Sequence, residues 1–212
     1  MDKLSSYIAK QIPGFEIRLK ESSFLMKLLS FVLFFNKFFM SRFVTTIYPI
    51  VYFPKAKLND GDSLGNMIIL CHEYVHLRDR KKLGPIFNIL YLSPQIFTLL
   101  ALLAIPFSLN WLWCLLFLLP IPSPARAYFE FKAYKMSISV YYLCLNKLPP
   151  IEFYVQQFTS SNYYWMFPAQ KFLTNKFNEH GKKLKKKEYD ELTVEIKNVL
   201  FPSKLWENKY YL

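Results

Sequence analysis

The sequence predicts an α+β fold that is mainly helical, with a small sheet bearing an edge strand and with an apolar helical hairpin. Apolar residues recur at helical spacing in 24–43, and helices are also expected at 62–82 and 125–145. Residues 44–54 are instead rich in β-branched and aromatic side chains, which is typical of a strand. Pro49 has no amide hydrogen to donate, so this strand belongs at the edge of its sheet. Residues 83–125 contain no charged residue, and 93–122 within them form the predicted hairpin.

The remaining elements follow from local composition. Residues 1–23 are mixed and polar, and they predict a short helix followed by an irregular stretch. The helix at 24–43 is expected to be amphipathic or buried, because lysines and an arginine interrupt it well short of the roughly 20 apolar residues of a membrane span. Asp62 or Ser63 is placed to cap the second of the three helical segments. A basic helix is expected at 182–200.

Length and composition predict one globular domain with an appendage. The 212 residues are 53% hydrophobic and 19% aromatic, which supplies a substantial core and excludes disorder. We expect residues 1–150 to form the main domain, hairpin included, and residues 151–212 to form an aromatic and basic helical extension packed on it. Three cysteines without a CxxC pair indicate a reducing compartment. The first residues show neither the apolar segment nor the cleavage site of a secretory signal peptide.

The sequence CHEYVHLRDR contains the pattern HExxH. His72 and His76 lie four residues apart on a predicted helix, hence on one face, one turn apart. At that spacing two imidazoles bind one zinc ion, and Glu73 beside the first ligand serves as the general base for a zinc-activated water. The alternative is a helix whose two histidines are ordinary core or surface residues.

A zinc site needs a third protein ligand. The pattern that places a glycine three residues and a ligand six residues after the second histidine fails, because Asp79 and Lys82 occupy those positions. His180 lies in a polar segment that predicts a solvated helix end. Glu130 is the better candidate, because it lies on a second predicted helix and completes a His₂Glu site with an open position for water. Otherwise Glu130 is a surface partner of Arg126, one turn earlier.

HExxH, then an apolar hairpin, then R-x-x-x-E-x-x-A resembles the gluzincin zinc metallopeptidases over roughly residues 40–140. The chain is similar to the membrane-embedded heat-shock-induced and prenyl-protein endopeptidases, and in its core to the minigluzincins. The resemblance implies a zincin-like domain with the hairpin between its two metal-binding helices. It also implies Zn²⁺ held by His72, His76 and Glu130, Glu73 as the catalytic base, and an extended peptide bound along the strand at 44–54 by strand addition.

One position departs from this pattern. The family carries an aspartate four residues after the ligand glutamate, as hydrogen-bond support for a zinc-binding histidine, and Tyr134 stands there. Asp79, on the same helical stripe as the two histidines, is a substitute support or else a surface partner of a neighbouring arginine. Arg126 is the third residue expected to support the metal ligands, beside Asp79 and Tyr134. The residue that stabilises the oxyanion stays open among four candidates: Arg126, Tyr163, Tyr164 and His180.

The apolar hairpin and the charge balance predict association with a membrane. The net charge of +12 favours anionic partners, and lipid is preferred over nucleic acid because basic residues flank the apolar stretches and no nucleic-acid motif is present. Because candidate ligands lie on both sides of 93–122, this segment would cross the membrane an even number of times. Each of its two apolar pieces is shorter than a membrane-spanning helix. A re-entrant or interfacial hairpin on the cytoplasmic face is expected, or else a hairpin packed within the protein. The lysine-rich run at 182–187 is a solvated helix face or a contact with lipid headgroups.

These observations lead to a zinc metallopeptidase that acts on a peptide or protein substrate. The alternative is a catalytically inactive gluzincin-like protein with a structural or interaction role in a membrane or particle assembly. A third hypothesis is a basic peripheral membrane protein in which HExxH is accidental. Substrate preference and oligomeric state do not follow from the sequence.

Overall fold

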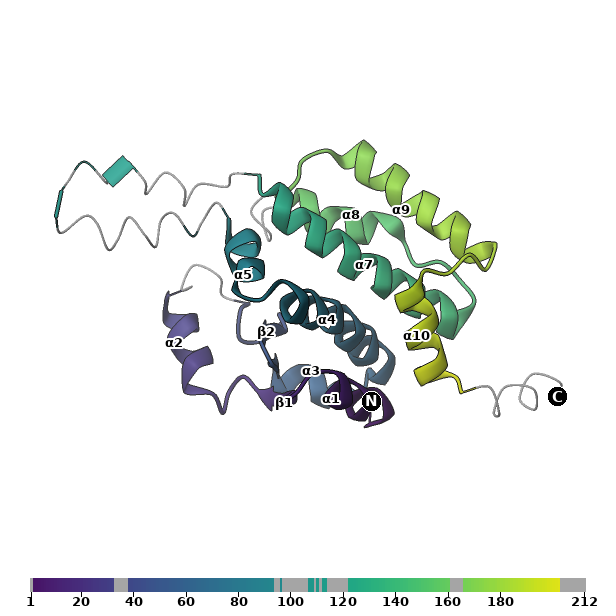
Figure 1. The fold of residues 1–212 in the computed structure, drawn as a ribbon, viewed down its shortest axis with the longest axis horizontal. Helices are drawn as coiled ribbons and strands as arrows, with labels where there is room; N and C mark the ends of the chain where they lie inside the picture. Colours follow the sequence, from purple (N-terminus) through teal and green to yellow (C-terminus); the bar gives the residue numbers. More distant parts are fainter. Residues whose placement is uncertain are drawn as a thin grey trace. The chain divides into compact units, whose positions relative to one another are not determined.

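The computed structural model describes residues 2–32, 38–93, 96, 107–108, 110, 112–113, 122–160 and 166–202. It is mostly helical with one three-stranded sheet, which confirms the predicted α+β class (Figure 1). Contacts between Cα atoms divide the chain into two compact units. The first comprises Met1–Lys81 with Asp190–Leu212, and the second comprises Lys82–Tyr189. These units differ from the predicted division at residue 150, and whether 1–150 forms a domain by itself stays a prediction.

The first unit contains the sheet and the HExxH helix. Its elements are α1 (Asp2–Gln11), β1 (Glu16–Leu19), α2 (Phe24–Val32), β2 (Thr45–Ile47), β3 (Ile50–Phe53), α3 (Lys55–Asn59), α4 (Ser63–Leu83) and α10 (Glu191–Leu200). The C-terminal helix α10 therefore returns to the unit formed by the start of the chain and packs on α1. A small apolar cluster joins α2 to the sheet through the buried side chains of Met26, Phe39 and Tyr52.

The sheet has the order β1-β3-β2, with β1 parallel and β2 antiparallel to β3. The prediction of one edge strand over 44–54 was wrong, because the chain reverses at Tyr48 and Pro49 and forms two strands. Proline lacks the amide that a continuous ladder needs, which makes the reversal point a suitable place for it. Consequently β3 is the central strand, and β2, paired through Thr46 and Val51, is an edge.

The predicted helix at 62–82 is confirmed as α4. Asp62 caps it, since its Oδ1 accepts a hydrogen bond from the amide of Gly65 at 2.7 Å. A Cβ on Gly65 would lie only 2.0 Å from Oδ2 of Asp62, so glycine makes room for the capping carboxylate. The start of the HExxH helix is therefore fixed by a local sequence signal.

The second unit is a group of helices: α5 (Pro85–Leu92), α7 (Pro124–Leu145), α8 (Ile151–Thr159) and α9 (Gln170–Lys185). Helix α9 packs on both α7 and α8, and α5 packs on α7. The core between them is aromatic, with Phe158 and Phe177 fully buried and Tyr134 edge-on to Phe158. Helix α7 confirms the predicted helix at 125–145.

Two other predicted helices differ from the observed ones in their bounds. Residues 182–200 are not one helix, because α9 ends at Lys185 and α10 begins at Glu191. Lys187 has a left-handed φ of 61°, and the side chain of Asp190 accepts a hydrogen bond from the amide of Thr193 at 2.8 Å. That cap starts a new helix, so periodicity across the break misled the prediction. The predicted helix at 24–43 is observed as α2, and 33–37 fall outside the described residues.

The predicted hairpin at 93–122 lies almost entirely outside the described residues. Among the helices that the structure does describe, none combines the length and apolar character that crossing a membrane requires.

Candidate metal centre

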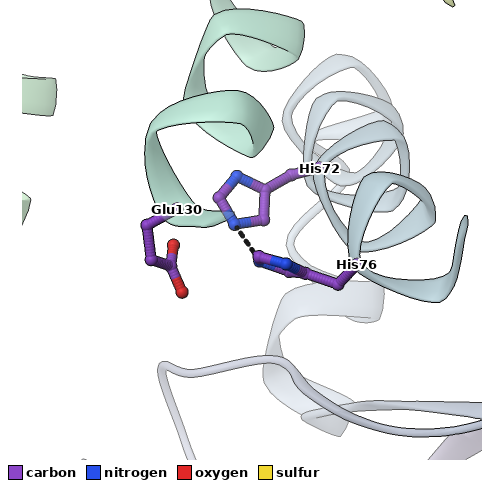
Figure 2. A group of neighbouring side chains, drawn as sticks. All are labelled: His72, His76 and Glu130. Carbon is purple, nitrogen blue, oxygen red and sulfur yellow. Dashed lines mark hydrogen bonds between the residues drawn. The ribbon is translucent and has the colours of Figure 1, made fainter. Parts of the chain in front are cut away.

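His72 and His76 project from the same face of α4 toward each other (Figure 2). Their Nε2 atoms are 3.3 Å apart, and the two rings stand edge to face. Zinc binds imidazole nitrogens at about 2.0–2.1 Å in a tetrahedral arrangement, which separates two ligand nitrogens by about 3.3 Å. The pair therefore has the spacing that one ion requires, and the fit arises within a single helix.

Glu73 lies beside this pair and is oriented by the sheet. Its side chain is nearly buried, with 9% of its surface exposed, and its Oε2 accepts a hydrogen bond of 2.7 Å from the hydroxyl of Thr46. Thr46 belongs to the edge strand β2, so this strand fixes one carboxylate oxygen of the HExxH glutamate. Sequence reasoning missed Thr46, because only the pairing of strand and helix brings the two residues together.

Lys20 is a second feature that sequence reasoning missed. It follows β1, it is fully buried, and its Nζ donates to the carbonyl of Phe39 at 2.7 Å and lies 3.8 Å from the centre of that ring. Burial lowers the pKa of its ammonium from 10.5 to about 8, while the negative charges of Glu73 and Glu21 act in the opposite direction. The HExxH glutamate therefore has a buried basic group within electrostatic range.

Glu130 lies on α7 in the second unit and is 3% exposed. The hydroxyl of Tyr91, from α5, donates a hydrogen bond to its Oε1. The guanidinium carbon of Arg126 lies 5.3 Å from the centre of the Tyr91 ring. The burial of Glu130 does not fit the alternative in which it is a residue on the helix surface. Its partner Tyr91 was not apparent from the sequence pattern. Because Glu130 and the histidines belong to different units, their sharing one ion is a proposal.

The other predicted site residues have varied outcomes. Asp79 is buried on α4, which does not fit a surface ion pair, and its support of a histidine stays a prediction. Tyr134 packs edge to face on Tyr154 and Phe158 in the core of the second unit, and its support of a ligand also stays a prediction. Tyr163 lies outside the described residues, as does Tyr164.

His180 is not at a solvated helix end, so that prediction was wrong. It lies inside α9, is buried, and its Nε2 is 3.0 Å from the hydroxyl of Ser139 and 3.2 Å from the carbonyl oxygen of Lys135. The polar residues around it in sequence occupy the exposed face of α9, whereas His180 points to the face that packs on α7.

No protein-family model, curated protein or solved structure matches this chain. The resemblance to the gluzincins therefore depends on the motif residues and on the geometry around them.

Proposed function

We propose that the chain is a zinc-dependent metallopeptidase with a zincin-like fold. The observation that carries this proposal is the pair of Nε2 atoms of His72 and His76, 3.3 Å apart on one face of α4. That separation matches two nitrogen ligands of a tetrahedral zinc ion. Glu73, the residue next to the first ligand, is nearly buried and already oriented through Thr46.

Glu130 is the proposed third ligand. The proposed ion would take one ligand atom from each of His72, His76 and Glu130, the three residues drawn in Figure 2. A His₂Glu set leaves the fourth position open for water, as in hydrolytic zinc sites. Tyr91 would hold the carboxylate from its other side, and a hydrogen bond of this kind orients a metal-binding carboxylate.

Zinc in this set would act as a Lewis acid toward the attacking water and the scissile carbonyl. Glu73 would serve as the general base that accepts a proton from the attacking water and as the acid that returns it to the leaving amine. The hydroxyl of Thr46 holds one oxygen of the Glu73 carboxylate and so orients the proposed base. Tyr91 holds one oxygen of the Glu130 carboxylate, and Arg126 lies over the ring of Tyr91. Low exposure of Glu73 and Glu130 limits competing water and strengthens these interactions.

The proposed substrate is an extended peptide segment. Strand β2 is an edge of the sheet and carries Thr46, the residue that contacts Glu73. A peptide that paired with β2 would therefore run past the proposed base, and its backbone would supply the hydrogen bonds.

Association with the cytoplasmic face of a membrane through residues 93–122 is part of the same proposal. The described residues of this segment include exposed Phe107, Leu112 and Trp113, which are suited to an apolar surrounding. Co-sedimentation of the full chain with anionic vesicles checks it. Recovery of all protein in the supernatant at low salt would contradict membrane binding and would leave the zinc proposal untouched.

Metal analysis combined with a peptidase assay tests the function. Wild-type protein is expected to bind one zinc ion, and Glu130→Ala to lose most of it, because a ligand is removed. Glu152→Ala is a matched control, since Glu152 is an exposed glutamate on α8 in the same unit. Glu73→Gln should keep the metal and lose turnover.

The outcomes separate the alternatives. Full turnover by Glu73→Gln would refute the mechanism, and wild-type protein without zinc would refute the site. Stoichiometric zinc without turnover on any peptide would favour the inactive structural or interaction protein with the same scaffold.

A further inference from the structure

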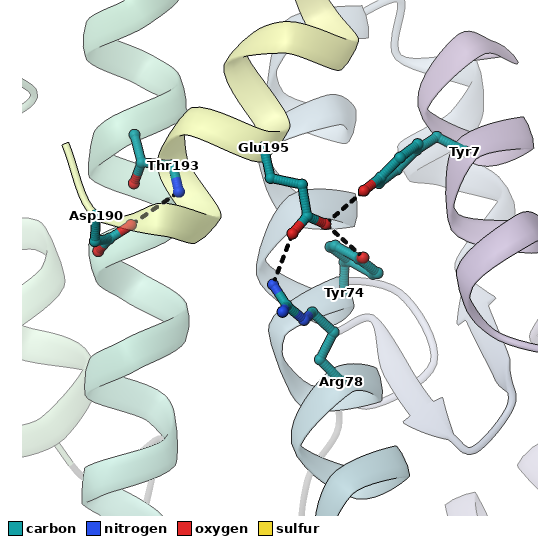
Figure 3. A network of polar contacts seen from close by, with 6 residues as sticks. All are labelled: Tyr7, Tyr74, Arg78, Asp190, Thr193 and Glu195. Atoms are coloured by element: carbon teal, nitrogen blue, oxygen red, sulfur yellow. Dashed lines mark hydrogen bonds and ion pairs between the residues drawn. The ribbon is translucent and has the colours of Figure 1, made fainter.

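The C-terminal helix α10 contacts the HExxH helix through one carboxylate, that of Glu195 (Figure 3). Its Oε1 accepts hydrogen bonds from the hydroxyls of Tyr7 at 2.6 Å and Tyr74 at 2.9 Å. Its Oε2 is 3.1 Å from Nη1 of Arg78. The four residues, which we call the Glu195 cluster, connect α1, α4 and α10 within the first unit.

The Glu195 cluster holds α4 on the side opposite to the histidines. Tyr74 and Arg78 are four residues apart, as are His72 and His76, and each pair therefore occupies one helical face. The two pairs are offset by two residues, which corresponds to about 200° around the helix axis. Two contacts one turn apart fix both the rotation and the axial position of a helix. Both quantities set where the imidazoles point.

Tyr74 is the buried member of the cluster, whereas the side chains of Arg78 and Glu195 are 39% and 24% exposed. Tyr74 is 1% exposed, so its hydroxyl needs an acceptor inside the protein, and Glu195 provides one. The hydroxyl of Tyr7 donates to the same carboxylate oxygen, so one acceptor serves both tyrosines. The Tyr7 ring also stands edge to face on that of Tyr74, with centroids 6.2 Å apart.

Helix α10 presents Glu195 from a fixed position. Asp190 caps the helix through the amide of Thr193, and the side chains of Thr193 and Ile196 are buried. The carboxylate therefore belongs to a helix that is itself anchored, and it is not a mobile surface group. A carboxylate held in this way can position the helix that it contacts.

We propose that Glu195 is a positioning residue for the metal centre: by binding Tyr74 and Arg78 on the far face of α4, it fixes the directions of His72 and His76. The inference rests on the proposed zinc site and adds to it a residue more than a hundred positions away in sequence. Glu195 does not touch the proposed ion. It acts through the rotation of the helix that carries the ligands.

The test measures metal affinity and helix order in the full chain. Zinc dissociation constants are determined by competition with a chromophoric chelator, and Co²⁺ absorption spectra report the ligand geometry. Glu195→Ala is expected to weaken zinc binding about 10- to 100-fold, the range typical for groups that orient metal ligands, and to alter the Co²⁺ spectrum. Glu195→Gln should lie between, because its amide oxygen still accepts from the tyrosines while the charge facing Arg78 is lost. Glu191→Ala, an exposed glutamate on the same helix, is the matched control.

Hydrogen exchange of metal-free protein makes the two proposals distinguishable. Faster exchange of the α4 amides in Glu195→Ala than in Glu191→Ala is expected, whether or not zinc binds. Wild-type protein that binds no zinc would refute the proposed function, and the exchange experiment would still decide whether Glu195 orders α4. Unchanged exchange together with unchanged zinc affinity would overturn the role of Glu195. If Glu195→Ala does not fold, Tyr74→Phe and Glu195→Gln carry the same comparison.

Discussion

Replacing Lys20 by methionine is expected to make the stability of the protein less dependent on pH in the alkaline range. The Lys20 ammonium is fully buried, with the carbonyl of Phe39 as its hydrogen-bond acceptor and the Phe39 ring below it. Methionine has a similar length and no charge, so it removes the cost of burying the ammonium. The loss of the bond to Phe39 is a separate cost that does not vary with pH in this range.

The sign and size follow from the lowered pKa. The folded state binds this proton less tightly than the unfolded chain, with a pKa of about 8 against 10.5. The contribution of Lys20 to folding is therefore intact above pH 10.5 and is lost as the pH falls toward 8. The full difference corresponds to about 3 kcal/mol, of which about 2 kcal/mol develops between pH 9.5 and pH 7.5. The stability of Lys20→Met relative to wild type should rise by that amount over the same interval.

Urea unfolding followed by circular dichroism at pH 7.5, 8.5 and 9.5 measures this difference. Comparing two variants at each pH cancels the titration of every other group that both share. Lys10→Met is the control, because it makes the same chemical change at a lysine that is exposed on α1. A difference between Lys20→Met and wild type that stays constant from pH 7.5 to 9.5 would refute the buried ammonium.

Two further predictions concern the supports of α4. Asp62→Ala removes the side-chain cap on the Gly65 amide and should lower the free energy of unfolding by about 1 kcal/mol in the same urea assay, and an unchanged midpoint would contradict the cap. Thr46→Val removes the hydroxyl that binds Glu73 and should lower kcat about tenfold or more at constant zinc content, because the proposed base loses its orientation. Wild-type kcat in Thr46→Val would show that Glu73 is held by other contacts.

Local signals in the sequence were sufficient for the helices that carry the candidate ligands. The helices predicted at 62–82 and 125–145 are observed as α4 and α7, and the capping signal at Asp62 located the start of α4. The spacing of His72 and His76 then predicted a pair on one face, since that relation depends only on helix geometry. The structure confirms this pair, whereas the metal itself stays a prediction.

Features that depend on contacts between distant segments could not be predicted from the sequence. Pro49 led to the prediction of one edge strand, because the sequence did not show that the chain would reverse there and place β3 in the centre of the sheet. Thr46 and Lys20 look like ordinary strand and surface residues until the sheet packs against α4. His180 was misassigned for a related reason, because its polar neighbours in sequence face away from the core that buries it.

Helix α4 combines these local and distant contributions, and this bears on the distinction between binding a metal and catalysing a reaction. The histidine pair follows from helix geometry alone, whereas the complete metal site also needs Glu130 and, as proposed, the restraint that Glu195 places on α4. Catalysis by a general base has a further requirement, because Glu73 must keep one orientation relative to that pair. Thr46 restrains Glu73 from the sheet, and Glu195 restrains the opposite face of the helix. A chain that only retained a zinc-binding scaffold would have no need of the Thr46 contact. Turnover by the wild-type protein therefore separates the enzyme from the inactive alternative, and a lower kcat in Thr46→Val would assign the orientation of Glu73 to this contact.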